Sequence, residues 1–339
     1  MNLVQLIEVR LRLRAGARFH SFHGPALYAF LLDRLGNPAL FPAGIGIVPV
    51  ERGRATYEPG EHYHFGLTLL PGASPTLDEW LVALAAPPRT AFGKTEHAPF
   101  GRHTVVIGAH DCIGRRPHRE RRAAEFLQLE HLDRAAEELC ATGTIEFWFD
   151  TPVQILRTPV ARKNTILDGT VFDVERFFVR TRDTVGAAYP ALTPLGAIPT
   201  ARVTRNRLLR TDSAYPKTTL IGTSGSIVVE LAEPLDRSWA RALLLAGVLG
   251  VGKSTNMGLG RFSANGIHVA PGWPPEPART LCQRAAALPN LHVARRALAD
   301  AGPAPGVDGI DRDRFLTALE WRIDNLAETL AASNKERGT

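Results

Sequence analysis

The stretch GVLGVGKSTNMGLGRF, residues 247–262, has the composition of a phosphate-binding loop. Gly247 to Ser254 fits the pattern G-x-x-x-x-G-K-[ST] of nucleotide hydrolases, in which a glycine-rich backbone surrounds phosphates. That loop requires a buried strand before it and a helix after it. Here residues 235–247 have helical spacing, and the glycines after Ser254 disfavour a following helix, since each costs about 1 kcal/mol in a helix interior. The sequence therefore predicts a helix, a glycine loop and a strand, and a nucleotide hydrolase is the weaker alternative.

The same loop is suited to another polyanion. Its glycines allow the backbone to approach a ligand closely and to expose N–H groups, and two cationic side chains add positive charge. The predicted phosphate contacts are Gly250, Gly252, Lys253, Ser254, Gly258, Gly260 and Arg261. The alternative is that the glycines only form a tight turn between a helix and a strand.

Two histidines and a tyrosine lie close together in the segment FHSFHGPALY. His20 and His23 precede a predicted helix, and Tyr28 lies one turn into it. Histidine has a pKa of about 6.5, so both rings can donate and accept protons near neutral pH. Their spacing can turn both rings to one side, and His23 precedes a helix N-terminus, where a phosphate is favourable. The alternative for each histidine is a hydrogen-bonded or surface residue.

A metal site is not predicted. His62 and His64 have strand spacing and share a face, but the adjacent Glu61 does not, and no fourth ligand is evident. The cysteines are far apart and odd in number, which fits neither a disulfide framework nor a metal site. They are Cys112, Cys140 and Cys282. We expect no cofactor.

The overall composition limits the classes of protein to which this chain can belong. The chain has 339 residues, of which 45% are hydrophobic, enough for two domains with cores. No apolar run reaches the length of a membrane span, and the N-terminus alternates rather than forming a signal peptide. We therefore expect a cytoplasmic protein that does not enter a membrane.

The net charge is +6, and arginine supplies nearly all of the basic side chains. Arginine binds phosphates bidentately and stacks on bases, which favours a nucleic-acid partner, although a GC-rich genome also favours arginine. The densest basic cluster, 114–122, can either follow RNA phosphates or begin a solvated helix.

Alternation, helical spacing and turn residues predict the order β-α-β-β-α-β in residues 1–115, the ferredoxin-like arrangement. The expected elements are a strand at 1–14, a helix at 24–36, strands near 45–57 and 61–70, a helix at 74–86 and a strand at 103–110. A helical connection follows at 116–143.

The same order recurs in a second half, 144–270. Its expected elements are strands at TIEFWFDTPVQIL, at TARVTRNRLLRT and at 215–231, the last interrupted at GTSG, helices at FDVERFFVRTRDTVGAAY and 235–247, and a closing strand at 260–270. The proline-rich residues 271–277 end this half, and 278–339 form a helical extension. The predicted fold class is α+β, with two tandem ferredoxin-like (RRM-like) domains and a helical C-terminal extension.

In this setting GVGKSTNMGLGRF resembles the glycine-rich signature of the CRISPR precursor-RNA processing endoribonucleases of the RAMP superfamily. Four further segments are similar to that family: FHGPALYAFLLDRLG, YEPGEHYHFGLTLLPG, TIEFWFDTPVQIL and FDVERFFVRTRDTV. The resemblance covers about residues 1–270, and the glycine loop is its most specific part.

The resemblance implies cleavage of CRISPR repeat RNA without a metal. The 2′-hydroxyl attacks the neighbouring phosphorus, which leaves a 2′,3′-cyclic phosphate and a 5′-hydroxyl. This needs a base, an acid and positive charge near the phosphate. His23 is the first candidate for base or acid, His20 the second, and Tyr28 is expected to orient the ribose or leaving group. Many family members instead carry the histidine near the end of the first helix, where this sequence has LGNPALFPAGIG.

The family also implies RNA contacts from the second half, whose central hairpin can enter the RNA stem. As a strand, ARVTRNRLLR alternates, with Arg202 and Arg210 on one face and Arg205 and Arg207 on the other. Arg205, Arg207 and Lys217 are the predicted contacts. The alternative to catalysis is an RNA-binding RAMP subunit that does not cut.

Near the C-terminus, PAPGVDGIDRDRFLTALEWRIDNLAETL is similar to the N-terminal motif of group II intron-type reverse transcriptases. Such enzymes are sometimes fused behind a nuclease of this family, with an adaptation integrase further on. The polymerase core is absent, so the resemblance implies a fragment or a relic of a fusion; the alternative is that GVDG is a turn before a helix. The predicted partners are CRISPR repeat RNA and a fused or associated reverse transcriptase and integrase.

Overall fold

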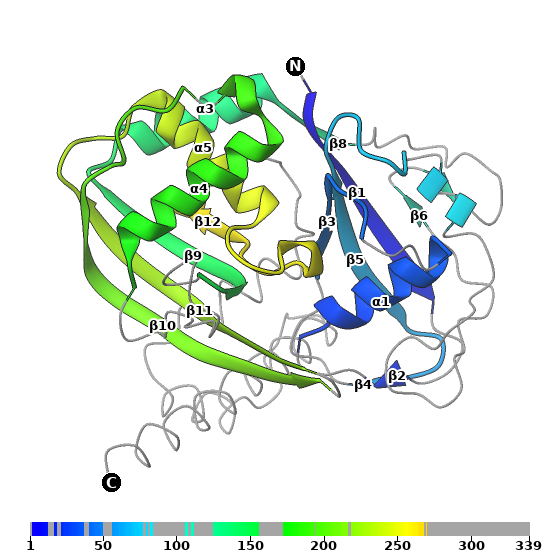
Figure 1. Cartoon of the computed structure of the whole chain (residues 1–339). Coiled ribbons are helices and arrows are strands. Elements are labelled where there is room, and N and C mark those ends of the chain that lie inside the picture. The colour runs from blue at the N-terminus through cyan, green and yellow to red at the C-terminus, as the bar shows by residue number, and fades with distance from the viewer. Residues whose placement is uncertain are drawn as a thin grey trace, which may run out of the picture.

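The computed structural model shows two sheets that carry helices (Figure 1). The described residues are 2–12, 17–18, 22–36, 41–49, 56–76, 79–80, 82–83, 106–107, 110–111, 125–155, 172–192, 194–215, 218–267 and 269. Within them the fold is mixed α+β, with two four-stranded antiparallel sheets and the helices α1, α3, α4 and α5, so the α+β part of the predicted fold class is confirmed. The predicted basic cluster at 114–122 and helical extension at 278–339 lie outside the described residues.

The first half forms a sheet with the strand order β3-β5-β1-β8. Its elements are β1 (Asn2–Arg12), α1 (Gly24–Arg34), β3 (Ile45–Val48), β5 (His62–Leu69) and β8 (Glu125–Gln128), with the short pair β2 (Ala17–Arg18) and β4 (Thr56–Tyr57). Alternation along β1 places Ile7 and Val9 in a core beneath α1, where they meet Leu27 and Phe65.

The strand that closes this sheet is β8, so the prediction of a closing strand at 103–110 is wrong. β8 pairs with β1, and Phe126 lies opposite Gln5. The predicted segment contributes β6 (Val106–Ile107), which pairs with β7 (His110–Asp111) in a separate two-stranded sheet. The helix α3 (Leu129–Cys140) begins directly after β8, later than the predicted start. A strand this short shows no clear alternation, and the helical pattern behind it dominated the prediction.

The second half has the strand order β10-β11-β9-β12, and its element order confirms the predicted β-α-β-β-α-β. Its elements are β9 (Thr144–Val153), α4 (Val174–Ala188), the 3-10 turn η1 (Pro190–Leu192), β10 (Ala201–Tyr215), β11 (Thr218–Leu231), α5 (Arg237–Leu249), the 3-10 turn η2 (Thr255–Met257) and β12 (Phe262–Ala264). β11 continues through the predicted interruption at GTSG, but its pairing with β9 shifts register there, between Thr223 and Gly225. Gly225 permits this with a φ of 115°, at a place where an added Cβ would come 2.4 Å from the carbonyl oxygen of Arg207.

The helices of the second half begin at capping aspartates. Asp173 accepts a hydrogen bond from the Arg176 amide and Asp236 one from the Trp239 amide, both at 2.8 Å, and such caps contribute about 1 kcal/mol each. Helices α3, α4 and α5 gather over one face of the second sheet (Figure 1). No described helix covers the opposite face of this sheet.

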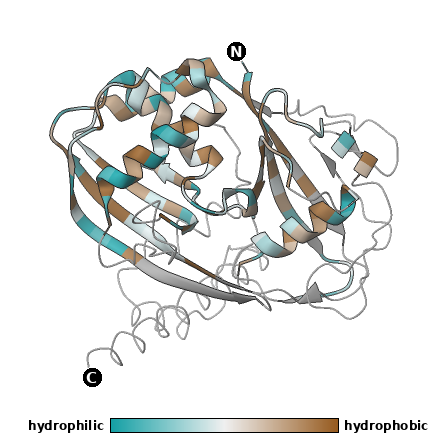
Figure 2. Cartoon of the chain, in the orientation of Figure 1, coloured by the Kyte–Doolittle hydropathy of each residue, from teal (hydrophilic) through white to brown (hydrophobic). Residues whose placement is uncertain are grey.

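The two halves share a core. Leu3 and Leu6 of β1 and Val48 of β3 belong to the same buried cluster as Ile145 and Ala246 of the second half. Figure 2 shows hydrophobic residues running along β1 and β5. β1 therefore packs against α1 on one face and toward the second half on the other. None of the helices described has the length and apolar character to span a bilayer.

Candidate functional site

The glycine-rich loop, residues 250–261, runs from the end of α5 to the start of β12, in the predicted order of helix, loop and strand. It lies between the two halves, because η2 within it contacts both β3 and α1 (Figure 1). An added Cβ at Gly24, the first residue of α1, would come 2.1 Å from the carbonyl oxygen of Met257. One at Gly258 would come 2.8 Å from that of Ile47. A side chain at either glycine would therefore push the loop away from the first half.

The N–H groups of Gly250, Gly258 and Gly260 are bonded within the protein, whereas the sequence predicted that the loop exposes its glycine N–H groups. Gly258 donates to the carbonyl of Thr255 and Gly260 to that of Pro152, both at 2.9 Å. An added Cβ at Gly260 would come 2.0 Å from the carbonyl oxygen of Val251. Positive φ angles occur at Gly250, Gly252, Gly258 and Gly260. The geometry supports the alternative role, a tight turn that only glycine can make.

Lys253 is exposed to solvent, and it is the one exposed cationic side chain of this loop. Its backbone N–H donates to the carbonyl of Gln154 at 2.9 Å, which fixes the loop against the end of β9, while the residue itself is exposed. Ser254 follows in a left-handed conformation with φ of 61° and is partly buried. Among the predicted loop contacts, Lys253 is therefore best placed for a phosphate that arrives from solvent.

Arg261 is 5% exposed, so its side chain is not accessible for the predicted contact with RNA. Its Nε donates to the carbonyl of Ile47 at 3.1 Å, its Nη2 to Oγ1 of Thr68 at 3.2 Å, and its Nη1 to the carbonyl of Val248. Burial lowers the pKa of Arg261 to about 9, and the carboxylate of Asp150 opposes that shift. The side chain joins the glycine-rich loop to β3 and β5 of the first sheet.

His23 is 0% exposed and precedes α1. Its Nδ1 lies 2.9 Å from Oη of Tyr63 on β5, and its ring centroid lies 6.2 Å from that of Tyr57. A histidine enclosed in this way does not reach an RNA phosphate in this conformation, which favours the alternative of a hydrogen-bonded residue. Sequence reasoning missed Tyr63, because it lies 40 residues away along the chain and no local spacing marks it.

Tyr28, the third predicted catalytic residue, is partly buried on α1, and its ring stacks on Phe41 with centroids 4.8 Å apart. The partial exposure keeps it a candidate for contact with a ribose. Two further predicted residues, His20 and Lys217, lie outside the described residues.

Arg202, Arg205 and Arg207 lie on one face of β10, so the prediction that Arg202 faces away from Arg205 and Arg207 is wrong. A β-bulge between Val203 and Arg205 inserts Thr204 and shifts the alternation. The cross-strand partners of these arginines on β11 are Glu230, Val228 and Ser226, of which Ser226 is buried. Arg202 forms an ion pair with Glu230 at 2.7 Å.

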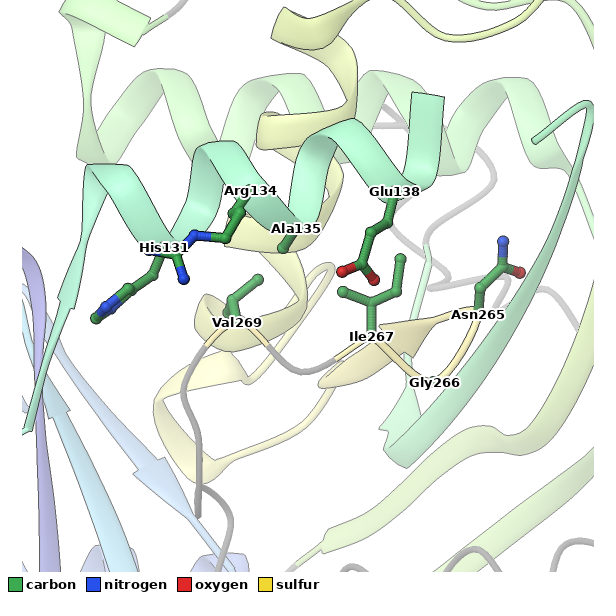
Figure 3. Close-up of a pocket in the computed structure, with 8 residues that line it drawn as sticks. All are labelled: His131, Arg134, Ala135, Glu138, Asn265, Gly266, Ile267 and Val269. Atoms are coloured by element: carbon green, nitrogen blue, oxygen red, sulfur yellow. The ribbon is translucent and has the colours of Figure 1, made fainter. Parts of the chain in front are cut away.

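A separate cavity of about 370 Å³ lies between α3 and the turn after β12 (Figure 3). His131, Arg134 and Glu138 line it from α3, and Asn265 and Ile267 from the other side. No predicted site residue lines it. Nor does any group of three or more His, Cys, Asp or Glu side chains in the described ranges come together to hold a metal ion.

Comparison with known proteins shows which solved structures have a similar fold. No protein-family profile and no curated protein matches the sequence. Among solved structures, a partial Cas6-RT-Cas1–Cas2 complex is similar with a TM-score of 0.57 and 16% identity, over 97% of this chain and 58% of that one. A Cas6-RT-Cas1–Cas2 complex matches with the same TM-score and identity over 97% of this chain, which spans 36% of the neighbour. A Cas6 product complex matches with a TM-score of 0.50 and 16% identity, over 78% of this chain and 100% of that one. The chain therefore has the fold of these Cas6-containing structures.

Proposed function

We propose that the chain is an endoribonuclease that cleaves CRISPR repeat RNA without a metal, by attack of the 2′-hydroxyl on the neighbouring phosphorus. The observation that carries the proposal is the glycine-rich loop, which is seated between two halves whose fold is similar to a Cas6 product complex. We infer that each half is a ferredoxin-like domain, because each sheet has the second, third, first and fourth strands side by side. The products carry 2′,3′-cyclic phosphate and 5′-hydroxyl ends.

In this proposal His20 is the base or acid and Tyr28 orients the ribose. His23 acts by position, since its buried ring holds the start of α1 against Tyr63. Lys253 supplies exposed positive charge at the loop. The further RNA contacts are Arg205, Arg207 and Lys217.

We also propose that residues 278–339 begin a reverse transcriptase segment and that an integrase is a further partner. The likeness to a partial Cas6-RT-Cas1–Cas2 complex supports a reverse transcriptase and an integrase as partners, while the proposal for residues 278–339 rests on their sequence resemblance. Because the chain spans 58% of that neighbour, a longer protein with these added parts fits the comparison.

The test is to incubate the purified chain with repeat RNA in EDTA and to analyse the ends of the products. We expect cleavage to a 2′,3′-cyclic phosphate, and we expect His20→Ala to abolish it while RNA binding persists. Cleavage that needs added Mg²⁺, or cleavage by His20→Ala at the wild-type rate, contradicts the proposal.

The second candidate function is an RNA-binding subunit that does not cut. The full burial of His23 favours it, since one of the two predicted acid–base residues is withdrawn from the surface. Tight binding of repeat RNA without any cyclic phosphate product would establish this alternative. A nucleotide hydrolase is disfavoured, because the loop follows a helix and the amides of Gly250, Gly258 and Gly260 are bonded internally.

A further inference from the structure

The charged side chains of α3 fall into two groups. On the side of α5 they are paired, since Asp133 bonds Arg241 and also lies 3.7 Å from Arg237. Three others line the cavity between α3 and the turn after β12, and none of these side chains has a hydrogen bond or ion pair with another residue that the structure describes. They are His131, Arg134 and Glu138.

The cavity is open to solvent, and the wall opposite α3 is fixed in place. Arg134 and Gly266 are exposed, and an added Cβ at Gly266 would meet nothing within 4 Å. The turn is held by Asn265, whose Oδ1 accepts from the Glu146 amide at 2.7 Å and whose Nδ2 donates to Oγ1 of Thr142 at 3.3 Å. Because these bonds occupy the Asn265 amide, it shapes the wall, and the side chains of α3 remain to bind a ligand.

The two ends of the cavity differ in charge. His131 and Arg134 are neighbours on one face of α3, and Figure 3 shows the Arg134 side chain extending toward His131. Glu138 lies about 6 Å beyond Arg134 and about 10 Å beyond His131 along the helix axis, at a rise of about 1.5 Å per residue. Its carboxylate points toward Ile267 (Figure 3). The apolar residues of the lining are Ala135, Ile267 and Val269.

Each of these features matches one part of a guanine nucleotide. A guanidinium binds a phosphate bidentately, and an imidazole N–H can add a further hydrogen bond. An ionised carboxylate accepts through two oxygens, which fit the adjacent N1–H and N2–H₂ donors of guanine. Adenine, cytosine and uracil do not present two adjacent donors on this edge. The volume of about 370 Å³ is near the lower end of the range for small-molecule sites, about 300–1,000 Å³, and suits one nucleotide rather than two.

We propose that this cavity binds a guanine mononucleotide, with its phosphate on Arg134 and His131 and its base edge on Glu138. The described lining residues lie outside the glycine-rich loop, so the site is additional to the proposed RNA cleavage and does not depend on it. A free nucleotide and a 5′-phosphoguanosine at the end of an RNA strand present the same groups to the cavity.

The test is calorimetric titration of the full chain with GMP, AMP and guanosine. GMP should bind at least about 10-fold more tightly than AMP, the discrimination expected of one bidentate contact to a base. Glu138→Gln, which offers one acceptor oxygen, should weaken GMP about 10-fold and leave AMP unchanged. Arg134→Ala should weaken GMP by a similar factor and leave guanosine unchanged, because guanosine has no phosphate.

Matched controls come from α4. Glu175→Gln and Arg182→Ala remove exposed charges that do not line the cavity, so both variants should bind GMP as wild type does. Equal affinity for GMP and AMP, no binding of GMP, or wild-type GMP affinity in Glu138→Gln or Arg134→Ala would each overturn the proposal. Inorganic phosphate that competes as strongly as GMP would also overturn it, since the site would then recognise an anion alone.

A competition experiment identifies the source of the nucleotide. An oligonucleotide that begins with 5′-phosphoguanosine and displaces GMP from wild type assigns the site to an RNA end, whereas failure to displace GMP assigns it to the free nucleotide. Cleavage of repeat RNA by Glu138→Gln should proceed at the wild-type rate. Absence of cleavage by wild type, with these GMP results intact, would instead count against the nuclease function alone.

Discussion

The Nη2 of Arg261 lies 3.2 Å from Oγ1 of Thr68, so an arginine of the glycine-rich loop is bonded to the sheet of the other half. The Thr68 hydroxyl in turn donates to the carbonyl of Gly46 at 3.3 Å. An added Cβ at Gly46 would come 2.9 Å from the same Nη2. The guanidinium therefore occupies a space that β3 and β5 leave for it. Any ligand held by the loop is positioned relative to the first sheet through this contact.

Replacement of Arg261 by lysine should lower the free energy of unfolding by about 2 kcal/mol, because an ammonium cannot bond the three acceptors that the planar guanidinium reaches. Urea denaturation of the two proteins measures the difference. Arg202→Lys is the control, since that side chain is 77% exposed, and it should change stability by less than about 0.5 kcal/mol. Equal losses from both changes would show that the buried contact has no special part in stability.

The buried charge also predicts a pH dependence. Because burial lowers the pKa of Arg261 to about 9, the folded chain holds this proton less tightly than the unfolded chain does. The cost of burying the charge is therefore present in full at neutral pH and recedes as the pH rises through about 9. Wild type should gain stability relative to Arg261→Met above that pH, measured by urea midpoints in matched buffers. A difference that stays constant from neutral to alkaline pH would contradict the assignment.

The contact of His23 with Tyr63 predicts separate effects on folding and cleavage. Tyr63→Phe removes the hydroxyl that faces Nδ1 and should cost about 1–2 kcal/mol, since a buried polar atom loses its partner. His23→Ala should cost more, because it also opens a cavity against two tyrosine rings. Denaturation midpoints and single-turnover cleavage of repeat RNA check both.

The positioning role of His23 requires that cleavage by Tyr63→Phe falls less than cleavage by His23→Ala, with a pH profile like that of wild type. His64→Ala, on the same strand and only partly buried, is the control and should leave cleavage unchanged. If Tyr63→Phe shifts the pH profile while leaving stability unchanged, His23 is an acid or base after all.

The turn of the glycine-rich loop can be tested by comparing Gly260, which lies in the loop, with Gly266, which lies after β12. Both glycines have positive φ. Gly260→Ala would place a Cβ 2.0 Å from the carbonyl oxygen of Val251, whereas Gly266→Ala meets nothing within 4 Å. We expect Gly266→Ala to cost about 1 kcal/mol from its conformation alone and Gly260→Ala to cost several times as much. Thermal melts measure both. Comparable melting temperatures for the two variants would show that the close approach at Gly260 is not maintained in solution.

Local patterns in the sequence predicted most helices and strands, but not the strand irregularities and the contacts between segments that are distant in the chain. The helix before the glycine loop and the strand after it follow from spacing and glycine content alone. By contrast, the bulge at Thr204 leaves no mark in an alternating strand, so the face of Arg202 could not be predicted. The burial of Arg261 depends on acceptors from Ile47 and Thr68, about two hundred residues earlier. A cation in a glycine-rich loop looks like a ligand contact until the opposing sheet is in place.

Lys253 distinguishes a loop that contacts RNA from one that only makes a turn. Lys253→Ala should leave the melting temperature unchanged, because the residue is exposed and the bond to Gln154 uses its backbone. Loss of one phosphate contact should weaken repeat RNA binding uniformly across sequences and reduce the slope of log affinity against log salt by about 1. Titrations at several salt concentrations, with Arg202→Ala as the control on another surface, measure this slope. An unchanged slope would mean that the loop acts through packing alone, and the phosphate contact would have to come from elsewhere.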